Sequence, residues 1–91
     1  MYRLIEISAY QAKFKKFIRK HPDLRGRLGH IYRDMQTDPF QPHLRLHALH
    51  GIHQGKQAVS VTQKYRIVLV ARITEKEIIL YDIGTHDDVY R

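Results

Sequence analysis

The sequence predicts a single α+β domain with the element order β-α-α-β-β-β, in which a helical hairpin covers one face of a mostly antiparallel sheet. Three observations support this prediction. The chain has 91 residues, which is enough for one modest hydrophobic core. Apolar side chains recur at helical spacing in its first half. In its second half they alternate with polar residues or form continuous runs, as they do in strands.

The first half is expected to contain one strand and two antiparallel helices. Residues 2–7 have the β-branched content of a strand, and Ser8 is expected to cap the helix that follows. The apolar stripe of this helix comprises Tyr10, Phe14, Phe17 and Ile18. The helix ends at His21, because the residue before a proline avoids the helical conformation, and Pro22 suits the first turn of the next helix. The stripe of the second helix comprises Leu24, Leu28, Ile31 and Met35.

The second half is expected to form strands joined by turns. Prolines indicate a loop at residues 37–42, and Gly51 and Gly55 mark a later turn. The expected strands are residues 57–62, 65–73 and 78–83. The long apolar run 65–73 is typical of a strand at the centre of a sheet, and residues 74–77 form the hairpin turn after it.

The charge of the chain is +7 with the histidines neutral, and it is unevenly distributed. Residues 1–45 carry +6, whereas residues 46–91 carry +1. A basic surface attracts polyanions, so nucleic acid or an acidic protein is the expected partner. A solvated surface that only keeps a small protein soluble is the plainer alternative.

The composition excludes several kinds of site and location. The chain has no cysteine, which excludes disulfides, thiol nucleophiles and thiolate metal sites. No apolar run approaches the roughly 20 residues of a transmembrane helix. Residues 1–7 are too short and too charged a segment for a signal peptide. We therefore expect a cytoplasmic protein with no membrane partner.

The densest group of reactive side chains lies at the C-terminus. A turn expected at Gly84 is followed by Thr85, His86, Asp87, Asp88, Val89, Tyr90 and Arg91. Histidine titrates near neutral pH, which makes His86 a candidate acid or base. Tyr90 is a candidate for stacking on a nucleic-acid base, with packing on the sheet edge as its alternative role. The two aspartates are expected to be turn or capping groups.

Arg66 stands at the head of the apolar strand and is costly to bury unless it is paired. It is expected either to bind phosphate with its planar guanidinium or to form a salt bridge to Asp82 or Asp87. Because neighbouring antiparallel strands run in opposite directions, Arg66 is expected to lie close to the end of the last strand, near His86.

A cation, an imidazole and a phenol in one cleft suit the cleavage of RNA by its own 2′-hydroxyl. A base takes the hydroxyl proton, an acid protonates the leaving 5′-oxygen, and arginine or lysine stabilises the charged phosphorane. The nucleophile belongs to the substrate, so neither a metal nor another cofactor is expected.

Three histidines, His47, His50 and His53, recur at intervals of three residues. On one helix they would share a face and could bind a metal. Gly51 argues against a helix here, and structural zinc usually takes four ligands. A histidine-rich surface loop is the plainer interpretation. A single acid or base remains the third alternative, and His47 is its candidate because it precedes the loop on the more ordered segment.

Further basic residues are candidates for contacts to RNA. Lys56 and Lys64 flank the strand 57–62 and are expected to add positive charge to the same cleft. The first helix contributes Lys13, Lys16, Arg19 and Lys20.

Together these features resemble the RelE/ParE toxin superfamily of bacterial type II toxin–antitoxin systems. The resemblance covers nearly the whole chain. It is carried by the element order, by Tyr65-Arg66-Ile67-Val68-Leu69-Val70 and by the tail from Ile83 to Tyr90. The segment His47-Ala48-Leu49-His50-Gly51 is similar to the His-x-Leu-x-Gly pattern of the YafQ branch. The tail is similar to that branch in its histidine and in the aromatic residue four positions later.

The resemblance implies an mRNA interferase that acts on messages in the ribosome and is neutralised by a cognate antitoxin. It implies that His86 and Tyr90 are the C-terminal catalytic pair, that His47 is the upstream histidine, and that Arg66 is the arginine of the active site. An acidic, partly disordered antitoxin that folds on binding would suit the basic half of the chain.

The chain departs from the YafQ pattern at two positions. That branch has a further histidine on the second strand and an acid just before the third, where this sequence has Ser60 and Lys64. Two other functions therefore stay open. A ParE-like inhibitor of DNA gyrase would share the fold and the charge, but the pair His86 and Tyr90 has no evident role in binding gyrase. A non-catalytic remnant that binds nucleic acid or an antitoxin is the other.

Overall fold

The computed structural model describes residues 1–89, apart from the side chains of His86 and Asp88. Its helices are α1 (Ser8–Lys20), α2 (Arg25–Thr37) and α3 (His86–Val89). Its strands are β1 (Arg3–Glu6), β2 (His47–Ala48), β3 (Gln57–Ser60), β4 (Tyr65–Arg72) and β5 (Glu77–Thr85). Short 3-10 turns cover Pro22–Leu24, Pro42–Leu44 and Gly51–His53. None of the helices within residues 1–89 is both long enough and apolar enough to cross a membrane.

The strands form one five-stranded sheet in the order β1-β5-β4-β3-β2. β1 runs parallel to β5, and the other neighbours are antiparallel. In the central hairpin Tyr65, at the start of β4, lies opposite Thr85, at the end of β5. The predicted α+β class and element order are confirmed, and the structure adds the short strand β2 and the helix α3 to them.

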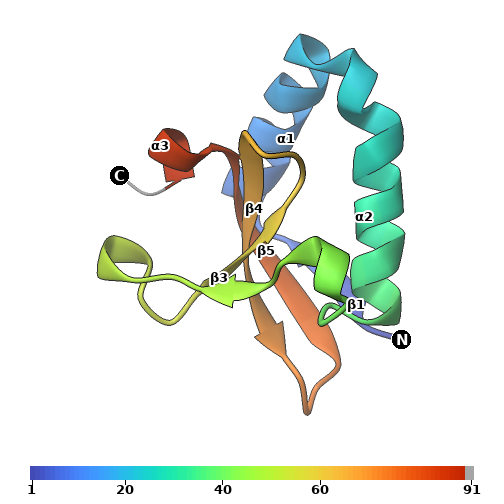
Figure 1. Ribbon diagram of the computed structural model, residues 1–91, viewed down its shortest axis with the longest axis vertical. Coiled ribbons are helices and arrows are strands. Elements are labelled where there is room, and N and C mark those ends of the chain that lie inside the picture. Colours follow the sequence, from blue (N-terminus) through green and yellow to red (C-terminus); the bar gives the residue numbers. More distant parts are fainter. Residues whose placement is uncertain (90–91) are drawn as a thin grey trace.

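The two faces of the sheet are covered unequally (Figure 1). On one face, α1 and α2 enclose the main core, which includes Tyr10, Phe17, Leu28, Met35, Ile67, Leu69, Ile78 and Leu80. On the other face a small cluster is formed by Leu49, Ala58, Val68 and Val89, with Tyr81 packed against it. Val89 therefore fixes α3 to the face that α1 and α2 leave uncovered.

The start of α1 differs from the prediction, because Ser8 is not the N-cap. The N-cap is Ile7, which is extended (φ −70°, ψ 158°) and makes no side-chain capping hydrogen bond. The amide of Ile7 donates to the carbonyl oxygen of Leu80 at 3.4 Å. This pairing with β5 keeps Ile7 extended, so Ser8 becomes the first helical residue. The second helix also begins later than expected, because Pro22–Leu24 form a 3-10 turn before it.

The turn expected at Gly84 is wrong as well. β5 continues through Gly84 to Thr85, because these two residues pair with Arg66 and Tyr65 of β4. The chain then passes straight from the strand into α3, which begins at His86. The reactive tail is thus attached to the end of a paired central strand.

A chain of hydroxyl groups joins α1, α2 and β1 beneath the helical hairpin. The hydroxyl oxygens of Tyr10 and Tyr32 are 2.6 Å apart, and Tyr32 donates to Glu6 Oε2 at 3.1 Å. Burial raises the pKa of both phenols above the ordinary value of 10.0, and the Glu6 carboxylate raises both further. Both tyrosines therefore stay protonated at neutral pH and stabilise this junction.

Candidate nucleic-acid interface

The side chain of Arg66 lies on the face opposite α1 and α2. Its neighbours across the strands are Ser60 of β3 and Gly84 of β5. Residues two apart on a strand share a face, and Val68 belongs to the small cluster there. Glycine has no side chain, so Gly84 leaves the position beside Arg66 open on the β5 side.

The guanidinium of Arg66 is half-buried and poorly satisfied. Its Nη1 donates to Ser60 Oγ at 3.3 Å, and its buried Nε has no hydrogen-bond partner among the described residues. The alternative salt bridge to Asp82 does not form, because Asp82 Oδ1 accepts from Lys13 Nζ at 2.7 Å. An arginine with an unsatisfied buried N–H suits an anionic ligand that supplies the missing acceptor.

The backbone brings the start of α3 beside the start of β4. Thr85 lies opposite Tyr65, and His86 follows Thr85 directly. The antiparallel arrangement expected from the sequence therefore places His86 close in the fold to Arg66. The side chain of His86 and all of Tyr90 lie outside the described residues, so their catalytic roles stay predictions.

His47 lies on the same face of the sheet as Arg66. It is opposite Ala58, which belongs to the cluster on that face, and its Nδ1 is 2.8 Å from the carbonyl oxygen of Arg45. β3 and β4 separate β2 from β5 in the sheet. α3 reduces this separation, because Val89 packs in one cluster with Leu49, two residues after His47.

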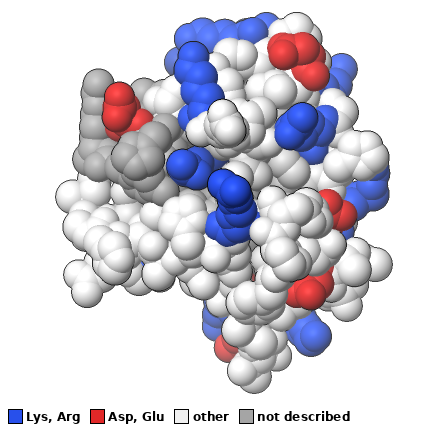
Figure 2. Space-filling model, viewed as in Figure 1, with Lys and Arg blue, Asp and Glu red and all other residues white. Residues whose placement is uncertain are grey.

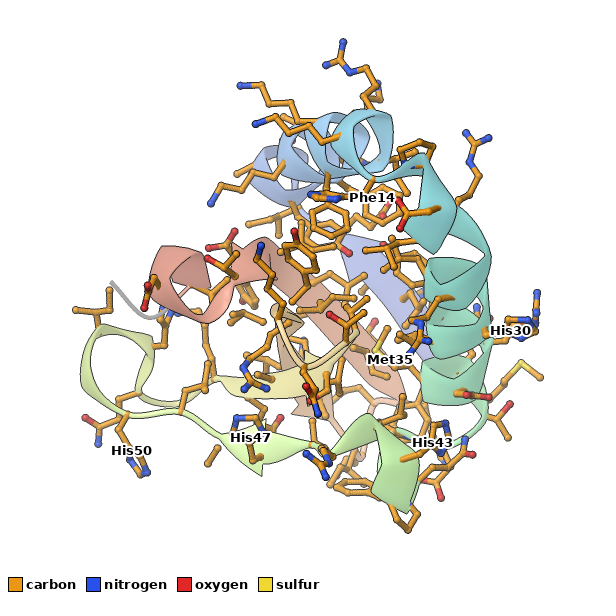
Figure 3. The ribbon with its side chains drawn as sticks, turned by 45° about the horizontal axis from the view of Figure 1, so that its top comes forward. Phe14, His30, Met35, His43, His47 and His50 are labelled. Atoms are coloured by element: carbon orange, nitrogen blue, oxygen red, sulfur yellow. The ribbon has the colours of Figure 1, made fainter. Side chains whose placement is uncertain are left out.

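The other histidines of this segment do not join His47. Figure 3 shows His50 farther out along the loop than His47. His53 lies in the 3-10 turn Gly51–His53. Within the part of the chain that the structure describes, no group of three or more histidine, cysteine, aspartate or glutamate residues is arranged to hold a metal ion.

Lys56 adds positive charge to the face that holds Arg66. Its Nζ lies 5.2 Å from the centroid of the Tyr81 ring, and Tyr81 packs against the cluster that contains Val68. An ammonium over an aromatic face is held by the ring quadrupole. The structure therefore places Lys56, His47 and Arg66 on one face.

Four other predicted RNA-binding residues line a cavity of about 430 Å³ at the end of α1: Lys13, Lys16, Lys20 and Lys64. Tyr65, Gly84 and Thr85 border the same cavity, so it lies at the strand ends where Arg66 is found. The predicted RNA-binding residues are thus divided between the two faces of the sheet. Figure 2 shows basic side chains gathered over α1 and continuing toward the centre of the molecule.

Arg19 is separate from these lysines. It lines a cavity of about 700 Å³ between α1 and α2, together with Lys15 and Arg25 at the rim and apolar residues such as Phe14 and Leu28. The structure therefore does not bring Arg19 together with the other predicted RNA contacts.

Two aromatic residues of the lysine-lined cavity are absent from the predicted site residues. The ring of His21 lies 4.6 Å from that of Phe17 and 4.8 Å from that of Tyr65, measured between centroids. The sequence places Phe17 in the core and His21 at the helix end. Their spacing of four residues, matching that of Lys16 and Lys20 beside them, is the signal that indicates a shared site.

Comparisons with known proteins show which fold this is. No protein-family model matches the sequence, and no curated protein sequence matches it. YafQ from Escherichia coli matches with a TM-score of 0.80 and 14% identity over 100% of both chains. A metal-bound toxin from Helicobacter pylori matches with a TM-score of 0.80 and 18% identity over 98% of this chain and 99% of that one. A YoeB/ParE toxin from Agrobacterium tumefaciens matches with a TM-score of 0.75 and 14% identity over 92% of this chain and 98% of that one. The chain therefore has the fold of the RelE/ParE toxin superfamily, as the sequence resemblance predicted.

Proposed function

We propose that this protein is an endoribonuclease, the toxin of a type II toxin–antitoxin pair, and that it cleaves mRNA on the ribosome. The fold it shares with YafQ and with a YoeB/ParE toxin supports the toxin part of the proposal. The choice of RNA as the substrate rests on the residues at the ends of β4 and β5.

The observation that carries the proposal is the state of Arg66. Its guanidinium is half-buried, has a buried Nε without a partner in residues 1–89, and lies beside the open position at Gly84. A phosphodiester group supplies oxygen acceptors and negative charge in the geometry that a guanidinium binds best. Ser60 holds one side of the guanidinium, so that it is oriented before a substrate arrives.

The proposed reaction is an attack of the substrate's 2′-oxygen on the adjacent phosphorus. A general base removes the 2′-hydroxyl proton, a P–O2′ bond forms, and the P–O5′ bond breaks. A general acid gives a proton to the leaving 5′-oxygen, which leaves a 2′,3′-cyclic phosphate and a 5′-hydroxyl. We assign the stabilisation of the charged phosphorane to Arg66 and proton transfer to His86 and His47, with Tyr90 orienting the substrate.

The proposed protein partner is an acidic antitoxin. E. coli YafQ has been solved as a DinJ–YafQ toxin–antitoxin complex, which this chain matches with a TM-score of 0.77 and 18% identity over 99% of its length and 98% of that chain. The net charge of +7 gives this chain the electrostatic attraction that such a partner needs.

Cleavage of a labelled RNA by the purified protein tests the proposal. Arg66→Ala is expected to lower the cleavage rate by a factor of about 10²–10³, the usual effect of removing one group that stabilises a transition-state charge. Arg72→Ala is the matched control, because Arg72 lies at the far end of the same strand, paired with Glu75 and Glu77. A wild-type protein that does not cleave RNA, or equal losses in both variants, would contradict the proposal.

Expression in bacteria separates this function from gyrase inhibition. An endoribonuclease arrests translation and creates new 5′ ends within coding sequences, whereas a gyrase inhibitor stops replication and leaves mRNA intact. Arrest of replication with intact messages would favour the ParE-like alternative.

A further inference from the structure

The lysine-lined cavity at the end of α1 has the features of a nucleotide-binding pocket. It lies on the helical face of the sheet, and its volume of about 430 Å³ falls within the roughly 300–1,000 Å³ of small-ligand pockets. Its wall combines ammonium groups from α1 and from Lys64 with the aromatic rings of Phe17, His21 and Tyr65.

The charge in this pocket is largely uncompensated. Lys13 is paired with Asp82 at 2.7 Å, but Lys16, Lys20 and Lys64 have no acidic partner among the described residues. Several like charges around one cavity repel one another unless an anion neutralises them. A phosphate group has the charge and the acceptor oxygens that three free ammonium groups require.

The aromatic rings provide a surface for a base. Phe17 and Tyr65 meet edge to face at 5.0 Å, and His21 packs against both rings. Phe17 is buried, whereas His21 and Tyr65 are partly exposed toward the cavity that they line. Nucleic-acid bases stack on such exposed rings with little regard to sequence.

The pocket and Arg66 are joined through the strand ends. Tyr65 lines the pocket, and the next residue, Arg66, points to the opposite face. On the neighbouring strand, Thr85 lines the pocket and the next residue, His86, begins α3 on the other face. An RNA strand that crosses this end of the sheet would contact both sites.

We propose that this pocket binds a nucleotide of single-stranded RNA next to the cleaved bond, with its base on His21 and Tyr65 and its phosphate among Lys16, Lys20 and Lys64. The RNA thus passes over the ends of β4 and β5, from the helical face to the face of Arg66. This inference rests on the proposed function for the position of the cleaved bond, but not for the binding of RNA.

Binding of a 2′-O-methylated RNA oligonucleotide, which lacks the attacking hydroxyl, tests the pocket without cleavage. Fluorescence anisotropy measures the Kd of the full-length protein at several salt concentrations. For Lys16→Ala/Lys20→Ala we expect at least a tenfold weaker Kd and a loss of about 1.4 in the slope of log K against log salt, at roughly 0.7 for each phosphate contact. The control Lys15→Ala/Arg25→Ala removes the same charge at the other cavity and should leave the slope unchanged. Equal losses in the two double variants would overturn the proposal, because net charge alone would then explain the binding.

A second comparison tests the aromatic contact. His21→Ala is expected to weaken the binding of the methylated oligonucleotide at least fivefold, and to have no effect on an abasic oligonucleotide of the same length. The same loss with both oligonucleotides would overturn the assignment of a base to this ring. If the protein binds RNA in this pocket but never cleaves it, the proposed function fails and the pocket stands. If it cleaves RNA with unchanged salt dependence in Lys16→Ala/Lys20→Ala, the pocket fails and the proposed function stands.

Discussion

Gly84 of β5 lies directly opposite Arg66 of β4, on the face of the sheet that α1 and α2 leave uncovered. On the other side of Arg66, Ser60 Oγ accepts a hydrogen bond from its guanidinium at 3.3 Å. The arginine therefore stands between a residue that holds it and a residue with no side chain. This arrangement leaves room for a phosphate on the side of β5, where His86 follows two residues later.

Arg66→Lys is expected to lower the cleavage rate at least tenfold although it keeps the positive charge. An ammonium cannot present the planar pair of N–H groups that a guanidinium offers to a phosphate. Because the charge develops in the transition state, the loss is expected in kcat rather than in KM. Single-turnover kinetics measure both. A change confined to KM would show that Arg66 only binds the ground state.

Ser60→Ala is expected to lower the rate about threefold to tenfold, the effect of losing one ordinary hydrogen bond. Ser60 acts through Arg66, so it is a positioning residue. In an Arg66→Ala background the same substitution is therefore expected to have no further effect on the rate. An undiminished effect in that background would show that Ser60 acts independently of the arginine.

Asp82→Asn is expected to strengthen RNA binding severalfold, because it releases Lys13 from its ion pair. If Lys13 then contacts a phosphate, the slope of log K against log salt becomes steeper by about 0.7. Glu75→Gln removes the same charge at the distant β4–β5 turn and serves as the control. Equal gains in affinity for both variants would mean that the effect is one of net charge alone.

Tyr32→Phe is expected to lower the free energy of unfolding by about 1–2 kcal/mol, because it leaves Tyr10 and Glu6 without their shared partner. Urea unfolding monitored by circular dichroism measures the change. Tyr2→Phe is the control, since the Tyr2 hydroxyl makes no hydrogen bond within residues 1–89, and it should change stability by less than about 0.5 kcal/mol. Equal effects of the two substitutions would contradict the role of this hydroxyl chain.

Alkaline pH is expected to destabilise the fold through the same two tyrosines. Their pKa values are raised in the folded state, so above about pH 10 the unfolded chain releases phenolic protons that the folded chain retains. The stability that they contribute is complete below about pH 10 and is lost progressively above it. The Tm of the wild type should therefore fall more steeply between about pH 9 and about pH 11 than that of Tyr10→Phe/Tyr32→Phe. Parallel curves would contradict this linkage.

The pairing of β4 with β5 could be predicted from the sequence because only a short turn separates two long apolar runs. That pairing alone is enough to place Arg66 beside the end of β5. The register of β3 was not predictable in the same way, because it depends on the conformation of residues 61–64. The contact of Ser60 with Arg66 therefore could not be expected from the sequence.

The division of the basic residues between two faces depends on how α1 docks. Helical spacing places Lys16 and Lys20 away from the apolar stripe, but it does not determine which strand end they meet. Likewise, Gly84 suggests a turn by its residue type, whereas cross-strand pairing with Arg66 keeps it in β5. Local propensity gives way to tertiary pairing at this position.

Cleavage of a synthetic RNA with a single 2′-deoxynucleotide on the 5′ side of the cleaved bond tests the central claim most directly. If the 2′-oxygen is the nucleophile, this one substitution abolishes cleavage at that bond, and the all-ribose RNA yields a 2′,3′-cyclic phosphate and a 5′-hydroxyl. Undiminished cleavage of the deoxy-substituted bond would contradict the proposed reaction.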